Sequence, residues 1–410
     1  MLNVIFTLDY EIHGNGDGDP LLLMVKPTQR LIKLFADYGA KLTIMADIAE
    51  ILKFKEYKEK TGRDDFYYEA IVEQLREAVR LGHDVQLHIH ASFFNARLEG
   101  RRWVQDWSEY DFAGLGLDRM REIVRVGKQF LENILQPVNA QYKCFVFRAA
   151  NWSVSPSKNV VRALVDNEIK IDTSVFKYGR RHGIVNFDYR QAPSALVPWQ
   201  VDEDDVCRSS KSGLLFEFPI YAENRFLGAF VTPQRLFRAF AGRLHKVADS
   251  YEERRPGQVG PASGTQRASL RSKGVLGRHS WKADFNQCSG RQLIGALKRA
   301  EANYGTLGIA LPFVLIGHSK LFTRFNEWSL RPFLSYVASR PNRFGFAIFA
   351  DCATSFPKAV PRPAQDTCFA SAAPREPWES PSGTGEAGSV LSLPAGTPGA
   401  YKSKPFRVWK

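Results

Sequence analysis

The stretch GHDVQLHIH, residues 82–90, combines a short apolar strand pattern with two histidines at its end. In an extended strand, residues two apart point to the same side, so His88 and His90 share one face and His83 lies on the other. Two imidazoles on one face at a strand end are a workable ligand pair for Zn²⁺ or a similar ion. The spacing alone leaves a structural pair open, and His83 is expected to be structural.

A second strand pattern, TLDYE at residues 7–11, places Asp9 and Glu11 on one face by the same two-residue period. Unpaired charges are costly to bury, so two acids at the end of an apolar strand rarely serve packing alone. One of these acids can complete a metal triad with the histidines while the other serves as a base.

Apolar runs of strand length recur along the chain and alternate with segments of helical spacing. The strands are expected at 3–8, 41–46, 84–89, 144–148, 169–172, 214–218, 313–317 and 344–349. The helices are expected at 28–38, 67–81, 118–134, 156–167, 233–249 and 289–303. This alternation predicts an α/β fold with a mostly parallel sheet, either closed into a barrel or left open between helical layers.

Three more of these runs end in polar side chains, namely Arg148, Asp172 and His318. In parallel α/β folds, catalytic groups collect at the carboxyl ends of the strands. Any one of these residues could form a structural ion pair, but five strands ending in ionisable residues favour a functional site.

The connection 91–117 is long and carries aromatic residues among polar neighbours. Long loops in compact domains are often functional, and this composition suits stacking on sugar rings or covering a site. A partly buried flap with its own small core is an equally good interpretation.

The formal charge of +13 could indicate a nucleic acid, an anionic membrane, an acidic polymer or merely basic tails. Residues 250–282 contain seven Lys or Arg against two Glu, and residues 357–410 contain seven against four acids, so these segments carry eight of the net charges. Both are rich in small residues and Pro, and neither has apolar periodicity. We expect a catalytic domain over 1–350 with a mobile low-complexity insertion at about 250–285, and a disordered tail over 357–410.

No recognised nucleic-acid motif accompanies these basic segments, so no specific nucleic-acid partner is expected. Binding of an anionic polymer by a basic arm remains the alternative to a solvated loop.

The chain contains no apolar run of about 18 residues, so no transmembrane segment is expected. The first residues enter a strand pattern at once, which leaves no room for a secretory leader. The five cysteines are widely spaced, with no Cys-x-x-Cys pair, which favours a reducing compartment. The expected location is cytoplasmic, and the sequence indicates no oligomeric state.

The ordered motifs TLDYE, GHDVQLHIH, FRAANW, DTSV and LIGH resemble those of the polysaccharide deacetylase family, carbohydrate esterase family 4, which has the NodB-homology domain. The resemblance covers residues 1–350. It implies an irregular (β/α)7-8 barrel of the NodB and glycoside hydrolase/deacetylase type. It also implies removal of an acetyl or similar acyl group from an amino sugar or glycan, with Zn²⁺ or else Mn, Co or Ni as the divalent metal.

The resemblance also implies roles for individual residues. Glu11 and His88 correspond to metal ligands, and Asp9 corresponds to the general base. The second family histidine falls on Ser92 of this chain, so we transfer its role to His90.

By the same resemblance, Arg148 orients the base, and Asp172 tunes His318, which protonates the leaving group. The sugar groove would be lined by Asn151, Trp152 and Tyr178, although either aromatic residue could instead belong to the core.

Two other functions compete with this interpretation. Residues 317–321 (GHSKL) resemble the nucleophile elbow of a serine esterase, but Leu321 stands where a small residue is needed and no histidine follows residue 318. The serine at position 92 also fits a catalytically degenerate homologue that only binds glycan.

Overall fold

The structure is a computed structural model that describes residues 1–230 and 277–353. The predicted helix over 233–249, the first part of the low-complexity insertion and the tail over 357–410 lie outside the described residues. The proposed domain boundaries therefore remain predictions.

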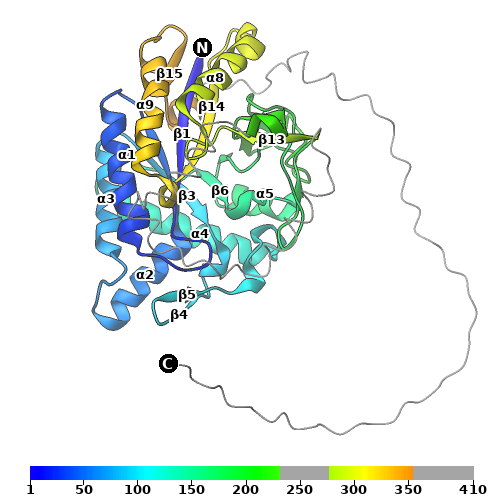
Figure 1. The fold of residues 1–410 in the computed structure, drawn as a ribbon. Helices are drawn as coiled ribbons and strands as arrows, with labels where there is room; N and C mark the ends of the chain where they lie inside the picture. The colour runs from blue at the N-terminus through cyan, green and yellow to red at the C-terminus, as the bar shows by residue number, and fades with distance from the viewer. Residues whose placement is uncertain (231–276, 354–410) are drawn as a thin grey trace, which may run out of the picture. The chain divides into compact units, whose positions relative to one another are not determined.

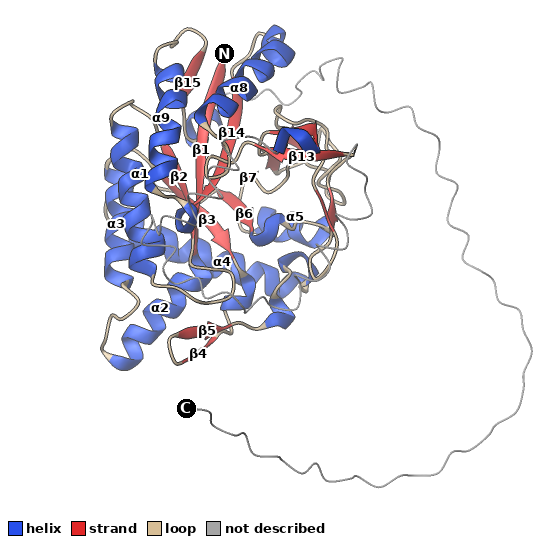
Figure 2. Ribbon diagram, viewed as in Figure 1, coloured by secondary structure: helices blue, strands red, loops and turns tan. Residues whose placement is uncertain are grey.

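A largely parallel sheet forms the centre of the fold (Figures 1 and 2). Its strand order is β10-β11-β7-β6-β3-β2-β1-β14, with β15 pairing on β1, and only β10 runs antiparallel to its neighbour. The strands are β1 (Leu2–Tyr10), β2 (Leu42–Asp47), β3 (Asp84–Ile89), β6 (Val146–Ala149), β7 (Ile171–Asp172), β10 (Trp199–Gln200), β11 (Phe216–Glu217), β14 (Leu311–His318) and β15 (Phe344–Phe346). Each of the eight predicted strands has a counterpart here. Strands β2 and β3 are buried at every position, as expected for strands covered on both faces.

Helices follow most of these strands and pack against one another around the sheet. Neighbouring contacts run from α5 to α4 to α3, and from α1 to α9 to α8 (Figure 1). The helices are α1 (Lys26–Ala36), α2 (Ile48–Thr61), α3 (Tyr68–Arg80), α4 (Leu117–Leu135), α5 (Ser157–Asp166), α8 (Gly290–Tyr304), α9 (Arg324–Ala338) and α10 (Phe349–Ala353). No described helix is both long enough and apolar enough to span a bilayer.

The sheet curls so that the chain beyond β11 returns to β14. A parallel bridge pairs Ile220 with Val314, and the Tyr221 N–H donates to the Val314 carbonyl at 3.0 Å. The fold is therefore mixed α/β with a curled, barrel-like sheet. The number of (β/α) units, seven or eight, remains a prediction from the resemblance.

The prediction of a mobile insertion over about 250–285 is wrong for its last residues, because residues 278–282 form a strand. This strand, β13 (Arg278–Lys282), pairs antiparallel with β12 (Ala222–Phe226). Trp281 is fully buried and anchors the strand. The strand could not be predicted from local sequence, because its flanking sequence is basic and contains glycine and its partner strand lies more than 50 residues earlier.

The aromatic connection 91–117 contains the hairpin β4 (Arg97–Glu99) and β5 (Arg102–Val104) together with short 3₁₀ turns. Trp103 is buried against Phe54 and Phe66, with ring centroids 6.1 and 5.2 Å away, whereas Trp107 is 42% exposed. One part of the segment is thus anchored in the core, and another presents an aromatic surface. A further short hairpin is formed by β8 (Arg180–Arg181) and β9 (Phe187–Asp188).

Candidate metal and acid–base site

Strand register brings the candidate residues together at the carboxyl ends of the parallel strands. Asp9 of β1 is paired with His318 of β14. Two strands along the sheet from β1, His88 of β3 is paired with both Asp47 of β2 and Arg148 of β6. Residues far apart in sequence therefore share one edge because parallel strands align their carboxyl ends.

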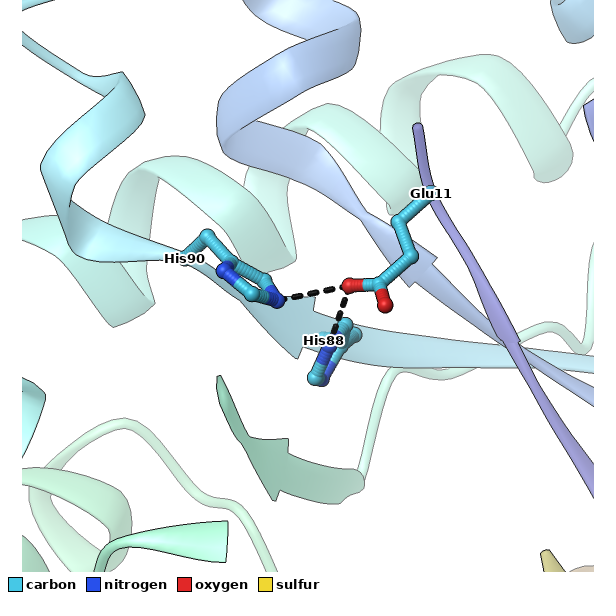
Figure 3. Close-up of side chains that lie close together, drawn as sticks. All are labelled: Glu11, His88 and His90. Carbon is cyan, nitrogen blue, oxygen red and sulfur yellow. Dashed lines mark hydrogen bonds and ion pairs between the residues drawn. The ribbon is translucent and has the colours of Figure 1, made fainter. Parts of the chain in front are cut away.

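Glu11, His88 and His90 form a compact cluster (Figure 3). Glu11 Oε2 lies 2.6 Å from His90 Nε2 and 3.2 Å from His88 Nε2. One potential ligand atom from each residue lies within 4.8 Å of the others, and all three residues are buried. Two imidazole nitrogens and one carboxylate oxygen are a donor set that suits Zn²⁺ and related ions, so the residues fit a divalent metal.

Neighbouring groups orient these three side chains. His88 Nδ1–H donates to the Arg148 carbonyl at 2.9 Å, which turns Nε2 toward Glu11. The Lys320 ammonium donates to Glu11 Oε1 at 2.7 Å and to the Ile12 carbonyl at 2.8 Å, leaving Oε2 on the histidine side. Such outer contacts fix the ring orientation and carboxylate geometry of metal ligands.

Charged neighbours shift the pKa values of two members of this cluster. Burial alone would raise the pKa of Glu11, but Lys320 and the two histidines hold the pKa well below its ordinary value. Burial would lower the pKa of His88, yet the carboxylates of Asp9 and Glu11 raise it to about 9.

Asp9 lies in a second buried ion pair next to this cluster. Arg148 Nη1 donates to Asp9 Oδ1 at 2.7 Å, and His318 Nε2 lies 3.5 Å from Asp9 Oδ2. Burial would raise the pKa of Asp9, but Arg148 and the two histidines hold it below its ordinary value. Burial lowers the pKa of His318 despite the nearby carboxylates. The geometry therefore favours an ionised Asp9 beside a neutral His318.

The structure does not bring Asp172 to His318 as the resemblance implied. Asp172 Oδ1 accepts the Ser174 hydroxyl at 2.6 Å, and its strand neighbour is Glu217 of β11. The carboxylate nearest to His318 is Asp9, with which it is paired in the register of β1 and β14. A role for Asp172 in tuning His318 therefore lacks the required contact.

The predicted sugar-groove residues lie on two loops, after β6 and after β7, and both loops contact Tyr189. Asn151 and Trp152 follow β6, and both adopt positive φ, 55° and 60°. Such backbone strain costs about 1–3 kcal/mol per residue and is typical of functional sites. The Trp152 ring lies 6.3 Å from that of His318, whereas the Tyr178 N–H donates to the Tyr189 carbonyl and its ring lies below Lys177.

The two serines that suggested competing functions are both buried and hydrogen-bonded. Ser92 is buried, and its hydroxyl donates to Gln105 Oε1 at 2.7 Å, so His90 and not residue 92 supplies the imidazole of the cluster. Ser319 is fully buried, and its Oγ accepts the Glu11 N–H at 3.4 Å, unlike the exposed serine of a nucleophile elbow.

Sequence reasoning missed several charged residues of the site. Asp47 caps α2 by accepting the Ala49 N–H, and the same oxygen accepts the His90 N–H, both at 3.2 Å. Its position between an apolar strand and a helix could have identified it as a helix cap. Glu50 accepts the Ile12 N–H at 2.8 Å, and burial together with Asp47 raises its pKa well above the ordinary value. Lys320 has no sequence pattern that distinguishes it from other lysines.

No protein-family model matches the chain, and no curated protein matches it. Among solved structures, a presumed polysaccharide deacetylase from Mycobacterium smegmatis aligns with 88% of this chain and 94% of its own, at 15% identity and a TM-score of 0.43. A GH57-type branching enzyme from Pyrococcus horikoshii aligns with 87% of this chain and 70% of its own, at 11% identity and a TM-score of 0.45.

A family 4 carbohydrate esterase from Streptomyces lividans, in complex with acetate, aligns over 42% of this chain and 61% of its own. Its identity is 12% and its TM-score is 0.26.

Proposed function

We propose that this protein is a metal-dependent hydrolase that removes an acetyl or similar acyl group from an amino sugar or glycan. The observation that carries the proposal is the Glu11–His88–His90 cluster lying beside an Asp9 that is held ionised by Arg148. The order of sequence motifs adds the substrate class, because a metal cluster alone does not specify a sugar.

Glu11, His88 and His90 would hold the ion, with zinc the first candidate and Mn, Co or Ni the alternatives. The chemistry that a divalent ion supplies in such a site is polarisation of a carbonyl oxygen and acidification of water.

Asp9 serves as the general base in this proposal. Its Oδ2 is the oxygen not engaged by Arg148 Nη1, and it can accept a proton from the attacking water. Arg148 keeps the carboxylate ionised and fixes its orientation through this 2.7 Å contact.

His318 is neutral before the reaction and receives the proton at Nε2 from Asp9, 3.5 Å away. It then passes the proton to the leaving nitrogen or oxygen as the acyl group departs. Trp152, whose ring lies 6.3 Å from that of His318, is proposed to contact the sugar together with Asn151 and Tyr178.

The test is acetate release from acetylated sugar nucleotides, lipid-linked sugars and polymers by the full chain, first stripped of metal and then resupplied with Zn²⁺. Release should require the metal and disappear in His88→Ala. The matched control is His182→Ala, which removes an exposed imidazole outside the cluster and should retain activity. Undiminished release by His88→Ala would contradict the proposed site.

A further inference from the structure

Lys282, the last residue of β13, places a cation next to the proposed site. Its Nζ lies 3.2 Å from the centroid of the Trp152 ring and 4.5 Å from that of Phe176. Within residues 1–230 and 277–353, this ammonium has no hydrogen-bond acceptor and no ion-pair partner. Lys282 is partly exposed, and attraction to the two ring faces compensates only part of its charge.

The nearby carboxylates are already engaged with other groups. Asp9 is paired with Arg148, and Glu11 is paired with Lys320. The carboxylate that follows β13, Asp284, accepts two backbone N–H groups of the turn after it, from residues 286 and 287. The positive charge of Lys282 is therefore left without a counter-ion in direct contact.

Two further hydrogen-bond donors beside Lys282 lack acceptors. Arg181 Nη1 donates to Asn151 Oδ1 at 3.0 Å, which identifies that atom as the amide oxygen. The Asn151 Nδ2 and the Trp152 Nε1 are buried and have no partner in the described part of the chain. Buried donors without partners indicate that an acceptor is missing.

We propose that Lys282, lying on the face of Trp152, binds an anionic substituent of the substrate, a carboxylate or a phosphate on the acylated sugar. This inference rests on the proposed function only for the sugar and its acyl group. An anion is the occupant that compensates the ammonium, and its oxygens are the acceptors that the neighbouring donors lack.

The surroundings of Lys282 leave it mainly in its cationic form near neutral pH, as binding of an anion requires. Burial lowers its pKa to about 8, the carboxylates of Asp284 and Asp9 oppose this shift, and Arg148 and Arg181 reinforce it. The ammonium form therefore predominates at pH 7 and becomes more stable when an anion binds.

The test is calorimetric titration of the zinc-loaded full chain at pH 7 with four probes. These are N-acetylglucosamine, its 6-phosphate, its 1-phosphate and N-acetylglucosaminuronate. At least one anionic probe should bind about tenfold more tightly than the neutral sugar. The 6-phosphate and the uronate separate phosphate from carboxylate recognition, and the 1-phosphate tests the position of the anion.

Lys282→Met should abolish this preference and leave binding of the neutral sugar within about twofold, whereas Lys282→Arg should retain the preference. Lys298→Met is the matched control, because it removes an exposed ammonium of α8 that lies over the Tyr336 ring of α9, outside the site. The inference is overturned if no anionic probe binds more tightly than the neutral sugar, or if Lys282→Met keeps the preference. Circular dichroism of each variant checks that the fold is retained.

Acetate release measured in parallel separates this inference from the proposed function. Lys282-dependent anion binding without acetate release would reject hydrolysis and keep the anion site. Equal release from neutral and anionic sugars, unchanged by Lys282→Met, would keep hydrolysis and reject the anion site.

Discussion

Two pairs of buried carboxyl groups lie at strand ends of the same sheet, yet their environments have opposite effects on their pKa values. Asp9 and Glu11 at the end of β1 are compensated by Arg148 and Lys320, and both pKa values lie below the ordinary range. Asp172 and Glu217 at the ends of β7 and β11 are almost equally buried, but burial and mutual repulsion raise the pKa of Glu217 well above its ordinary value.

Burial raises the pKa of Asp172 as well, although hydrogen bonds and Arg148 oppose the shift. The comparison shows that burial alone does not decide the protonation state of an acid, since the cations next to the first pair reverse its effect. The first pair is therefore the one suited to the metal ligand and the base proposed above. In the second pair burial raises both pKa values, which favours the protonated form of an acid.

The largest expected effect is on catalytic activity, which should depend on the first pair of carboxyl groups and much less on the second. Asp9→Asn should lower acetate release by about 10²–10⁴-fold, the usual contribution of a general base. Asp172→Asn, which preserves the shape of a neutral acid, should retain release within about tenfold. Comparable losses in steady-state assays of both variants would remove the distinction between the pairs.

Removing the compensating cation should destabilise the first pair. Arg148 is fully buried, so Arg148→Met leaves the Asp9 carboxylate uncompensated and should lower the free energy of unfolding by about 3–5 kcal/mol. Urea denaturation measures this change. The double variant Asp9→Asn/Arg148→Met should recover part of the loss, and a double variant no more stable than Arg148→Met alone would argue against the ion pair as the cause.

The contact between Lys320 and Glu11 should contribute to metal affinity. Lys320→Met frees the Glu11 carboxylate to rotate and should weaken Zn²⁺ binding about 10–100-fold, the usual effect of an outer-sphere partner. Lys55→Met, which removes a lysine paired with Glu59 on the surface of α2, is the control. Tighter binding by Lys320→Met would show that the lysine competes with the metal.

The raised pKa of Glu217 in the second pair predicts that the stability of the fold decreases as pH rises. Because the folded-state pKa of Glu217 is raised, the folded protein binds this proton more tightly than the unfolded chain does. Its contribution to stability is therefore lost as pH rises from the ordinary value of 4.5 toward the raised value.

Glu217→Gln removes this titration while keeping an acceptor for the Val175 N–H. The decrease in unfolding free energy between pH 5 and pH 8 should shrink by about 1.4 kcal/mol for each unit of pKa shift removed within that interval. An unchanged pH profile in denaturant titrations would show that Glu217 is ionised in the folded protein.

Much of the sheet could be predicted because its strands are continuous apolar runs that end in polar residues. Helices α2 and α9 were not predicted. The second half of α2 is dominated by Lys and Glu that form surface ion pairs, and α9 contains Pro332, which normally ends a helix. Strand β13 was missed because its stability comes from pairing with β12 and burying Trp281, which local sequence does not show.

The site was predictable to the extent that it depends on strand period. His88 and His90 lie two positions apart at the end of β3, as Asp9 and Glu11 do at the end of β1, and the structure brings these side chains together. The contacts of Asp172, Lys282 and Lys320 depend on which strands become neighbours and on side chains from distant segments. Their surroundings could not be read from the local sequence.

The most direct test of the account is equilibrium dialysis of the full chain against Zn²⁺, with metal content measured afterwards. The account predicts one bound ion per chain in the unmodified protein and in Asp172→Asn, and loss of that ion in Glu11→Gln and His90→Ala. Retention of a stoichiometric ion by both of these variants, or its absence from the unmodified protein, would contradict the assignment of Glu11, His88 and His90 as the metal site.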